Sequence, residues 1–383
     1  MPVDPFGRYP YNGNMALNCG IVGLPNVGKS TIFSALTSAP AEAANYPFCT
    51  INPNVGIVDV PDPRLRKLAE IFKPKRVVPA SVEFVDIAGL VKGASQGEGL
   101  GNQFLSHIRE VGVIAQVVRC FDNPDIIHVS NKVDPESDME TINVELALAD
   151  LDTVAKRRDK AVRALKVQSK DQQKQAELLI SALDKVQGAL EQGKPARSVP
   201  LSDDERAALW DSHLITMKSQ LYVCNVDEEG MRQGNPYVDM VKARAAAENS
   251  EAVVICGKFE AELADLESEE ERLAFLSELG LKESGLSSLI HAAYRLLGLR
   301  TFFTAGEDEC RAWTIHRGDT APKAAGVIHT DFERGFIKAE VYSYEDLLTY
   351  GSEAKIKEAG KYRIEGKEYI VQDGDVMFFK FNV

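Results

Sequence analysis

The chain has 383 residues, of which 44% are apolar and 26% are charged, so a folded core is expected rather than a disordered chain. Its formal net charge of −13 argues against a protein that coats nucleic acid through overall charge. No apolar run reaches the roughly 18 residues of a membrane span, and no secretory signal pattern opens the chain. The six cysteines show no C-x-x-C spacing. A cytoplasmic protein with no membrane partner is therefore expected.

Residues 1–14 are rich in Pro, Gly and Asn, and we expect a disordered leader or tag there. An apolar strand is predicted over Leu17–Val22, and a helix is predicted to begin near Thr31. Between them lies a stretch matching G-x-x-x-x-G-K-S/T, the P-loop pattern, whose backbone N–H groups surround phosphates at a helix N-terminus. Lys29 is expected to reach the β- and γ-phosphates, and Ser30 to ligate Mg²⁺. The expected nucleotide contacts are Asn26, Val27, Gly28, Lys29, Ser30 and Thr31.

Further strands are predicted over apolar runs that follow the P-loop, which indicates a mostly parallel, doubly wound α/β sheet. The predicted runs are Val55–Val60, Val82–Asp86, Val113–Arg119, Leu221–Val226 and Ala252–Cys256.

A second magnesium ligand is predicted at Asp86, which ends a strand and opens a D-x-x-G pattern. The Gly89 N–H is expected to approach the γ-phosphate, where a side chain would be in the way. Thr50, in the loop before the Val55 strand, is the predicted third magnesium ligand, against the alternative of an inert surface threonine.

Leu90 follows this glycine, at a position where many GTPases place a glutamine that orients the attacking water. Leucine has no donor or acceptor, so either intrinsic hydrolysis is slow or another group positions the water. His128 is a candidate for that group, although a lone histidine is more often structural.

Two stretches compete for reading the base. Asn131-Lys132-Val133-Asp134 spells N-K-x-D, but it follows the Val113–Arg119 strand without room for a crossover helix. Asn225-Val226-Asp227-Glu228 stands directly at the end of the next predicted strand. There, Glu228 replaces the aspartate that selects guanine, and a side chain longer by one methylene should fit guanine poorly. We therefore predict a base site at Asn225, Val226 and Glu228 that accepts ATP, in preference to GTP.

Residues 143–205 are expected to form a helical coiled-coil insertion, because apolar residues recur there at steps of three or four. Its turn is predicted at Gln168–Gln173. Basic residues between Lys156 and Lys174 form a candidate RNA-binding face, although a solvated helix face is the simpler interpretation.

Composition changes again near Thr301, and residues 301–383 are expected to form a separate α+β domain. The domains predicted are thus 15–142 with 206–300, the insertion 143–205, and 301–383. Within the last domain, strands are predicted at Gly326–His329, Gly335–Val341, Glu368–Val371 and Val376–Phe381, and a helix at Tyr344–Tyr350.

The runs GLPNVGKST, NYPFCT, FVDIAGLVKGASQGEGLGNQFL, NVDE and FFTAGEDECRAWTIHRGD resemble the YchF branch of the Obg-related P-loop GTPases, and the resemblance covers nearly the whole chain after Met15. The resemblance implies a P-loop G domain, a coiled-coil insertion and a carboxy-terminal TGS domain of β-grasp type. It also implies ATP hydrolysis in preference to GTP, association with ribosomes or ribosomal subunits, and a function in translation or stress response. His128 matches a suspected substitute for the missing glutamine.

Two other functions stay open from the sequence. One is a conventional ribosome-assembly GTPase that reads guanine through Asn131 and Asp134. The other is a nucleotide-gated scaffold whose hydrolysis is incidental. Nothing in the sequence indicates oligomerisation, so a monomer is expected.

Overall fold

The structure is a computed structural model that describes residues 18–38, 54–87, 100–126, 128, 132–165, 169–266 and 268–382. The described residues divide into two compact units. One lies within Met15–Val58 and Glu83–Ala293, and the other within Asp59–Val82 and Tyr294–Val383. No helix among these residues combines the length and the apolar character that a bilayer span needs.

The first unit is built on a six-stranded sheet of order β2-β4-β1-β5-β6-β7. The strand β1 runs parallel to both β4 and β5, and β5, β6 and β7 continue the parallel arrangement. This confirms the predicted doubly wound sheet, with strand ends shifted by a residue or two. The strands are β1 (Asn18–Gly23), β2 (Val55–Asp59), β4 (Ser81–Asp86), β5 (Val113–Arg119), β6 (Ser219–Asn225) and β7 (Glu251–Ile255).

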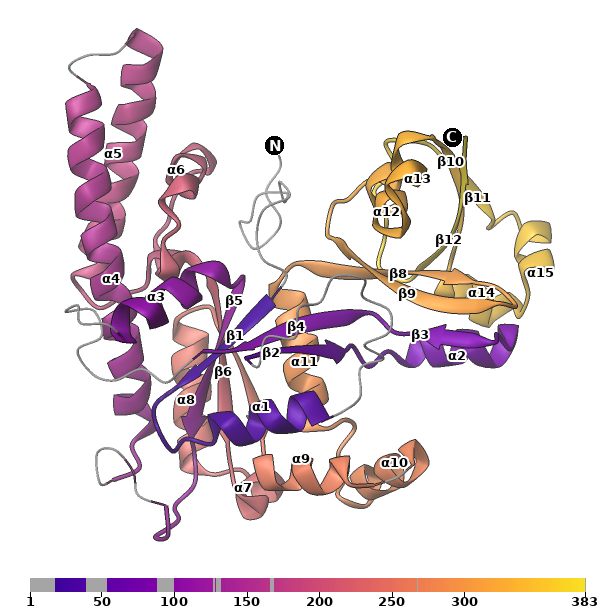
Figure 1. The fold of residues 1–383 in the computed structure, drawn as a ribbon, viewed down its shortest axis with the longest axis horizontal. Coiled ribbons are helices and arrows are strands. Elements are labelled where there is room, and N and C mark those ends of the chain that lie inside the picture. Colours follow the sequence, from indigo (N-terminus) through magenta and orange to yellow (C-terminus); the bar gives the residue numbers. More distant parts are fainter. Residues whose placement is uncertain are drawn as a thin grey trace. The chain divides into compact units, whose positions relative to one another are not determined.

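Helices pack around this sheet and cover its strands (Figure 1). Buried Ile32 on α1 and Val238 on α8 belong to their core-facing sides. The helices are α1 (Lys29–Ser38), α3 (Leu100–Glu110), α4 (Pro135–Ala164), α5 (Lys170–Leu190), α6 (Asp203–Leu209), α7 (Glu228–Gln233), α8 (Pro236–Ala247), α9 (Gly257–Ala264), α10 (Glu269–Glu278) and α11 (Gly285–Leu296), with 3₁₀ turns η3 (Ala196–Ser198), η4 (Trp210–Ser212) and η5 (Ile215–Met217).

The helices α4 and α5 form a long pair that extends away from the sheet (Figure 1), as the apolar spacing predicted. Val154 of α4 packs with Leu183 and Val186 of α5 in one buried cluster. The predicted turn at Gln168–Gln173 is wrong at its carboxyl side, because α5 already begins at Lys170. Ser169 stands at the N-cap, and its backbone N–H donates to the Gln172 side chain at 3.2 Å, which starts the helix there.

The first turns of α4 pack against the sheet and do not take part in the helix pair with α5. The helix begins at Pro135, and Met139 is fully buried in a cluster with Tyr222 and Cys224 of β6. Only the later part of α4 pairs with α5. The insertion is therefore rooted in the core of the first unit.

The second unit contains a six-stranded sheet of order β11-β10-β12-β8-β9-β3. Its core includes Phe302, Ile315, Val341 and Met377, and α12 adds buried alanines to it. Its elements are α2 (Pro63–Phe72), β3 (Arg76–Val78), β8 (Leu299–Ala305), β9 (Glu309–His316), α12 (Ala321–Ile328), α13 (Thr330–Arg334), β10 (Phe336–Ser343), α14 (Tyr344–Tyr350), α15 (Glu353–Glu358), β11 (Arg363–Glu365) and β12 (Asp375–Phe381).

Two strand predictions in this unit are wrong. The run Gly326–His329 lies in and just after α12, because Pro322 stands in the first turn of that helix and Ala321, Ala324 and Ala325 bury one face. The run Glu368–Val371 forms no strand, and Ile370 makes only an isolated bridge to Thr320.

One segment of the expected G domain folds with the second unit. The strand β3 pairs in parallel with β9, with Val77 opposite Cys310. The Arg64 side chain on α2 forms an ion pair with Asp373 at 2.7 Å and lies over the Phe303 ring, 5.2 Å from its centroid. Residues 59–82 thus differ from their predicted placement in a continuous 15–142 segment.

Candidate nucleotide-binding site

The P-loop connects β1 to α1 and adopts a backbone that only certain residues allow. Asn26 has a φ of 64° and Gly28 a φ of 93°, both in the left-handed region. A Cβ atom on Gly28 would lie 2.1 Å from Nδ2 of Asn225, so no side chain fits there. The helix α1 begins at Lys29 directly afterwards, which points its first free N–H groups toward the loop.

Lys29 and Asp86 meet beside the loop. The strand β4 lies next to β1 with Asp86 opposite Ile21, and the Lys29 Nζ pairs with the Asp86 carboxylate. Ser30 is exposed at the start of α1. A hydroxyl and a carboxylate at one edge are oxygen donors of the kind Mg²⁺ prefers, and the carboxylate already holds a cation. The residues present therefore fit a magnesium ion bound together with phosphates.

Three predicted positions, Thr50, Gly89 and Leu90, lie outside the described residues. The assignments of Thr50 as a magnesium ligand and of Gly89 as a γ-phosphate contact stay predictions.

Asn225 links the P-loop to the end of the sheet. Its Nδ2 donates to the Val27 carbonyl oxygen at 2.9 Å, and its Oδ1 accepts from the Gly257 N–H at 3.3 Å. The side chain is 94% shielded from solvent, because only 6% of its surface is exposed. One amide therefore holds together the phosphate loop and the loop after β7.

The residues that follow Asn225 differ in their exposure. The Val226 side chain is buried in the core, and its N–H donates to the Ile255 carbonyl at 2.8 Å. Glu228 opens α7, is half-exposed and pairs with Lys258 at 3.0 Å. This hydrogen bond and the positive charge of Lys258 lower the pKa of the Glu228 carboxyl. The ionised Glu228 carboxylate therefore forms an ion pair with Lys258 at the surface.

The competing N-K-x-D stretch has another structural function at its last residue. Asp134 is the N-cap of α4, where its carboxylate accepts from the Ser137 N–H at 3.2 Å. Lys132 is exposed, and Asn131 lies outside the described residues. The Asn225 side chain contacts the P-loop through the Val27 carbonyl, whereas the described contact of the Asp134 carboxylate is with the Ser137 N–H.

Two family profiles match the chain. Residues 18–194 match one described as a 50S ribosome-binding GTPase, and residues 299–382 match one for the carboxy-terminal part of YchF GTPases, described as a protein of unknown function. A Bacillus subtilis protein named ribosome-binding ATPase YchF is 57% identical over 371 residues, which covers 96% of this chain and 100% of the relative. The chain belongs to the YchF family.

Two further comparisons with YchF proteins support this assignment. A Haemophilus influenzae relative of the same name is 55% identical over 369 residues, which cover 96% of this chain and 100% of the relative. The solved structure of the Schizosaccharomyces pombe YchF GTPase is 40% identical, covers 97% of this chain and 100% of that chain, and gives a TM-score of 0.87. The predicted resemblance and the P-loop fold are thereby confirmed.

His128, the predicted water-orienting residue of this YchF chain, lies in a buried pair. Its Nε2 is 2.9 Å from Oδ2 of Asp138 on α4, and both side chains are almost fully buried. Burial raises the pKa of Asp138, while the contact with His128 acts against that rise. The catalytic assignment of His128 stays a prediction.

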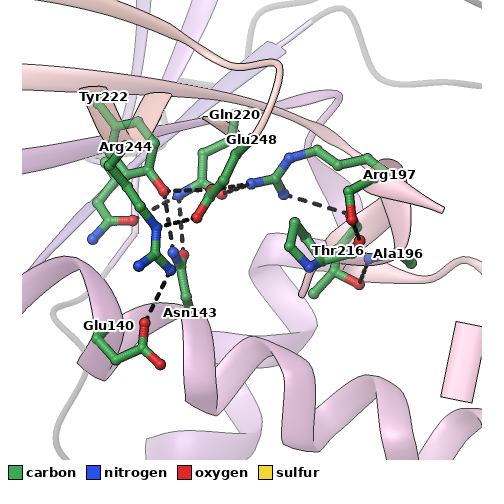
Figure 2. Close-up of polar contacts among 12 residues, drawn as sticks. Glu140, Asn143, Ala196, Arg197, Thr216, Gln220, Tyr222, Arg244 and Glu248 are labelled. Carbon is green, nitrogen blue, oxygen red and sulfur yellow. Dashed lines mark hydrogen bonds and ion pairs between the residues drawn. The ribbon is translucent and has the colours of Figure 1, made fainter. Parts of the chain in front are cut away.

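A buried polar network that the sequence did not reveal lies at the root of the insertion (Figure 2). Glu248, at the end of α8, accepts from Arg197 at 2.9 Å and from the Tyr222 hydroxyl at 2.9 Å, and it pairs with Arg244. Arg197 also donates to Gln220 at 2.7 Å. Burial lowers the pKa of Arg197, and Glu248 opposes that shift.

Hydrogen bonds of this network connect both ends of the insertion to β6. Asn143 of α4 donates to the Tyr222 hydroxyl at 3.1 Å and accepts from Gln220 at 3.2 Å, while Arg197 lies in η3 at the return of the insertion. The same strand ends at Asn225. No pattern in the sequence connects Arg197 to Glu248, because the contact depends on how distant segments fold together.

Proposed function

We propose that this YchF-family chain is a Mg²⁺-dependent nucleoside triphosphatase that hydrolyses ATP in preference to GTP. The proposal depends most on Asn225, whose amide is fixed between the Val27 carbonyl and the Gly257 N–H. The aspartate that would accept from guanine is replaced by Glu228, and the described contact of that side chain is with Lys258. The bacterial relatives are named ribosome-binding ATPase, which agrees with an ATP preference.

In the proposed site, the P-loop N–H groups from Asn26 to Thr31 and the Lys29 ammonium hold the β- and γ-phosphates. Ser30, Thr50 and Asp86 provide the protein ligands of Mg²⁺. When bound, Mg²⁺ neutralises charge on the phosphate oxygens.

Around these groups, the Gly89 N–H approaches the γ-phosphate. Asn225 and the Val226 main chain contact the base, with Glu228 at its edge. His128 orients the attacking water.

We also propose that the nucleotide state controls binding to a ribosome, a ribosomal subunit or another RNA-containing partner, in translation or stress response. The relatives are named ribosome-binding, and both α4 and α5 carry basic residues. In this proposal the coiled-coil insertion (143–205) and the TGS-like domain (301–383) make the contacts. The G domain comprises 15–142 and 206–300 apart from residues 59–82, which fold with the second unit, and the protein is a cytoplasmic monomer.

The variant Asp134→Asn separates this function from a GTPase that reads guanine through Asn131 and Asp134. Asn is as good an N-cap as Asp, so the substitution preserves the start of α4 and changes only what the carboxylate could accept from a base. We expect unchanged affinity for ATP and for GTP in calorimetric titrations with Mg²⁺, and tighter binding of ATP by the unmodified protein. Loss of GTP binding by the variant, or a tenfold preference of the unmodified protein for GTP, would contradict the proposal.

A further inference from the structure

A groove of about 530 Å³ lies between α3 and α4 in the first unit. The helix α3 contributes Leu105 and Arg109, and α4 contributes the other lining residues. The cationic residues of this groove are Arg109, Lys156, Arg157 and Lys160.

The groove is strongly cationic on a protein whose overall charge is −13. The lining contains one carboxylate, Asp152, which pairs with Lys156 at 2.6 Å. Arg157 and Lys160 have no carboxylate within ion-pair distance in the part of the chain that the structure describes. On a solvated helix face, opposite charges commonly pair one helical turn apart. Most of the charged residues of this groove are instead positive, and they line a concave space.

Hydrogen bonds with residues 215–218 fix both helices that line the groove. The Lys218 ammonium donates to the carbonyl oxygens of Arg109 and Val111, which fixes the end of α3. Asp150 on α4 is fully buried and accepts from the N–H groups of Ile215 at 2.9 Å and Thr216 at 2.7 Å. The cations therefore project from a rigid framework, so little backbone ordering opposes binding.

We propose that the groove between α3 and α4 binds the phosphate backbone of an RNA strand. This inference rests on the proposed function, and it names the surface that contacts the RNA-containing partner. Lys156 and Lys160 are one helical turn apart, about 6 Å along the axis, so they can contact different phosphates of one strand. Arg109 and Arg157 add planar guanidinium groups that match phosphate oxygens, and Leu148, which is 42% exposed, offers an apolar contact beside them.

The test compares two double variants with the same change in charge. Arg157→Glu with Lys160→Glu alters the groove, and Lys170→Glu with Lys174→Glu alters exposed positions on α5 outside it. The probe is a fluorescein-labelled 12-nucleotide RNA, titrated by anisotropy between about 50 and 200 mM KCl. We expect the groove variant to bind at least about tenfold more weakly and the slope of log K against log salt to fall by about 1.4, since each lost phosphate contact removes about 0.7. The α5 variant should stay within about threefold of the unmodified protein.

Thermal melts and ATP titrations of both variants verify that each is folded. Equal losses in the two variants would overturn the groove assignment in favour of a general charge effect. Loss in the α5 variant alone would overturn it and leave RNA binding by the insertion intact. Displacement of the RNA by polyglutamate at equal charge concentration would overturn it in favour of an acidic protein partner. An unmodified protein that binds neither RNA nor ribosomes would instead contradict the proposed partner, while its ATP affinity would be unaffected.

Discussion

Replacing Asn225 with Ala should weaken both the site and the fold around it. The substitution removes the hydrogen bonds to the Val27 carbonyl and to the Gly257 N–H, at 2.9 Å and 3.3 Å, from a side chain that is almost fully buried. Each such bond contributes about 1 kcal/mol net, so the free energy of unfolding should fall by about 2 kcal/mol. For a unit of this size that corresponds to a fall of about 4–8 °C in Tm.

The same change should reduce ATP affinity by at least about tenfold, or about 1.4 kcal/mol, because the P-loop loses its support and the base loses one polar contact. The assays are calorimetric titration with ATP and Mg²⁺ and differential scanning calorimetry without nucleotide. Asn225→Asp is the matched control of equal size. It keeps the acceptor for Gly257 but places an oxygen against the Val27 carbonyl, so it should be at least as damaging as Ala. An Ala variant with unchanged Tm and unchanged ATP affinity would refute the reasoning.

Two further predictions concern stability. Glu248→Gln leaves the buried Arg197 charge without its carboxylate and should lower the free energy of unfolding by about 3 kcal/mol in urea melts, whereas Glu140→Gln, at a half-exposed pair with Arg244, should cost less than about 1 kcal/mol. Equal effects would contradict the importance assigned to the buried network. Burial lowers the pKa of Lys218 to about 8, so above about pH 8 the unfolded chain keeps a proton that the folded chain has lost. Stability should then rise by about 2 kcal/mol relative to Lys218→Met between about pH 8 and pH 10 in urea melts at each pH, and a constant difference would contradict this.

The sheet of the first unit could be predicted because its strands are continuous apolar runs, and a parallel strand buried on both faces needs such a run. The prediction of a base site at Asn225 rather than at the N-K-x-D stretch depends on which residue directly follows a strand, and it stays a prediction. In the structure Asp134 is the N-cap of α4, so its carboxylate has a hydrogen-bond partner that does not depend on a bound base.

Long-range pairing could not be predicted. The strand β3 is only three residues long, and nothing in Arg76–Val78 indicates that its partner is β9. The segment Gly326–His329 is a short apolar run without a decisive period, so its residues alone favour a strand. The signal for a helix start, Pro322, lies four residues before it. The network around Glu248 joins residues from four separate segments, so only the folded chain reveals it.

The most direct test of the ATP assignment is a crystal structure with Mg²⁺ and a non-hydrolysable ATP analogue. We predict that the adenine lies against the Asn225 side chain and the Val226 main chain, with Ser30 and Asp86 at the metal. A purine lying instead against Lys132 and Asp134 would contradict the account.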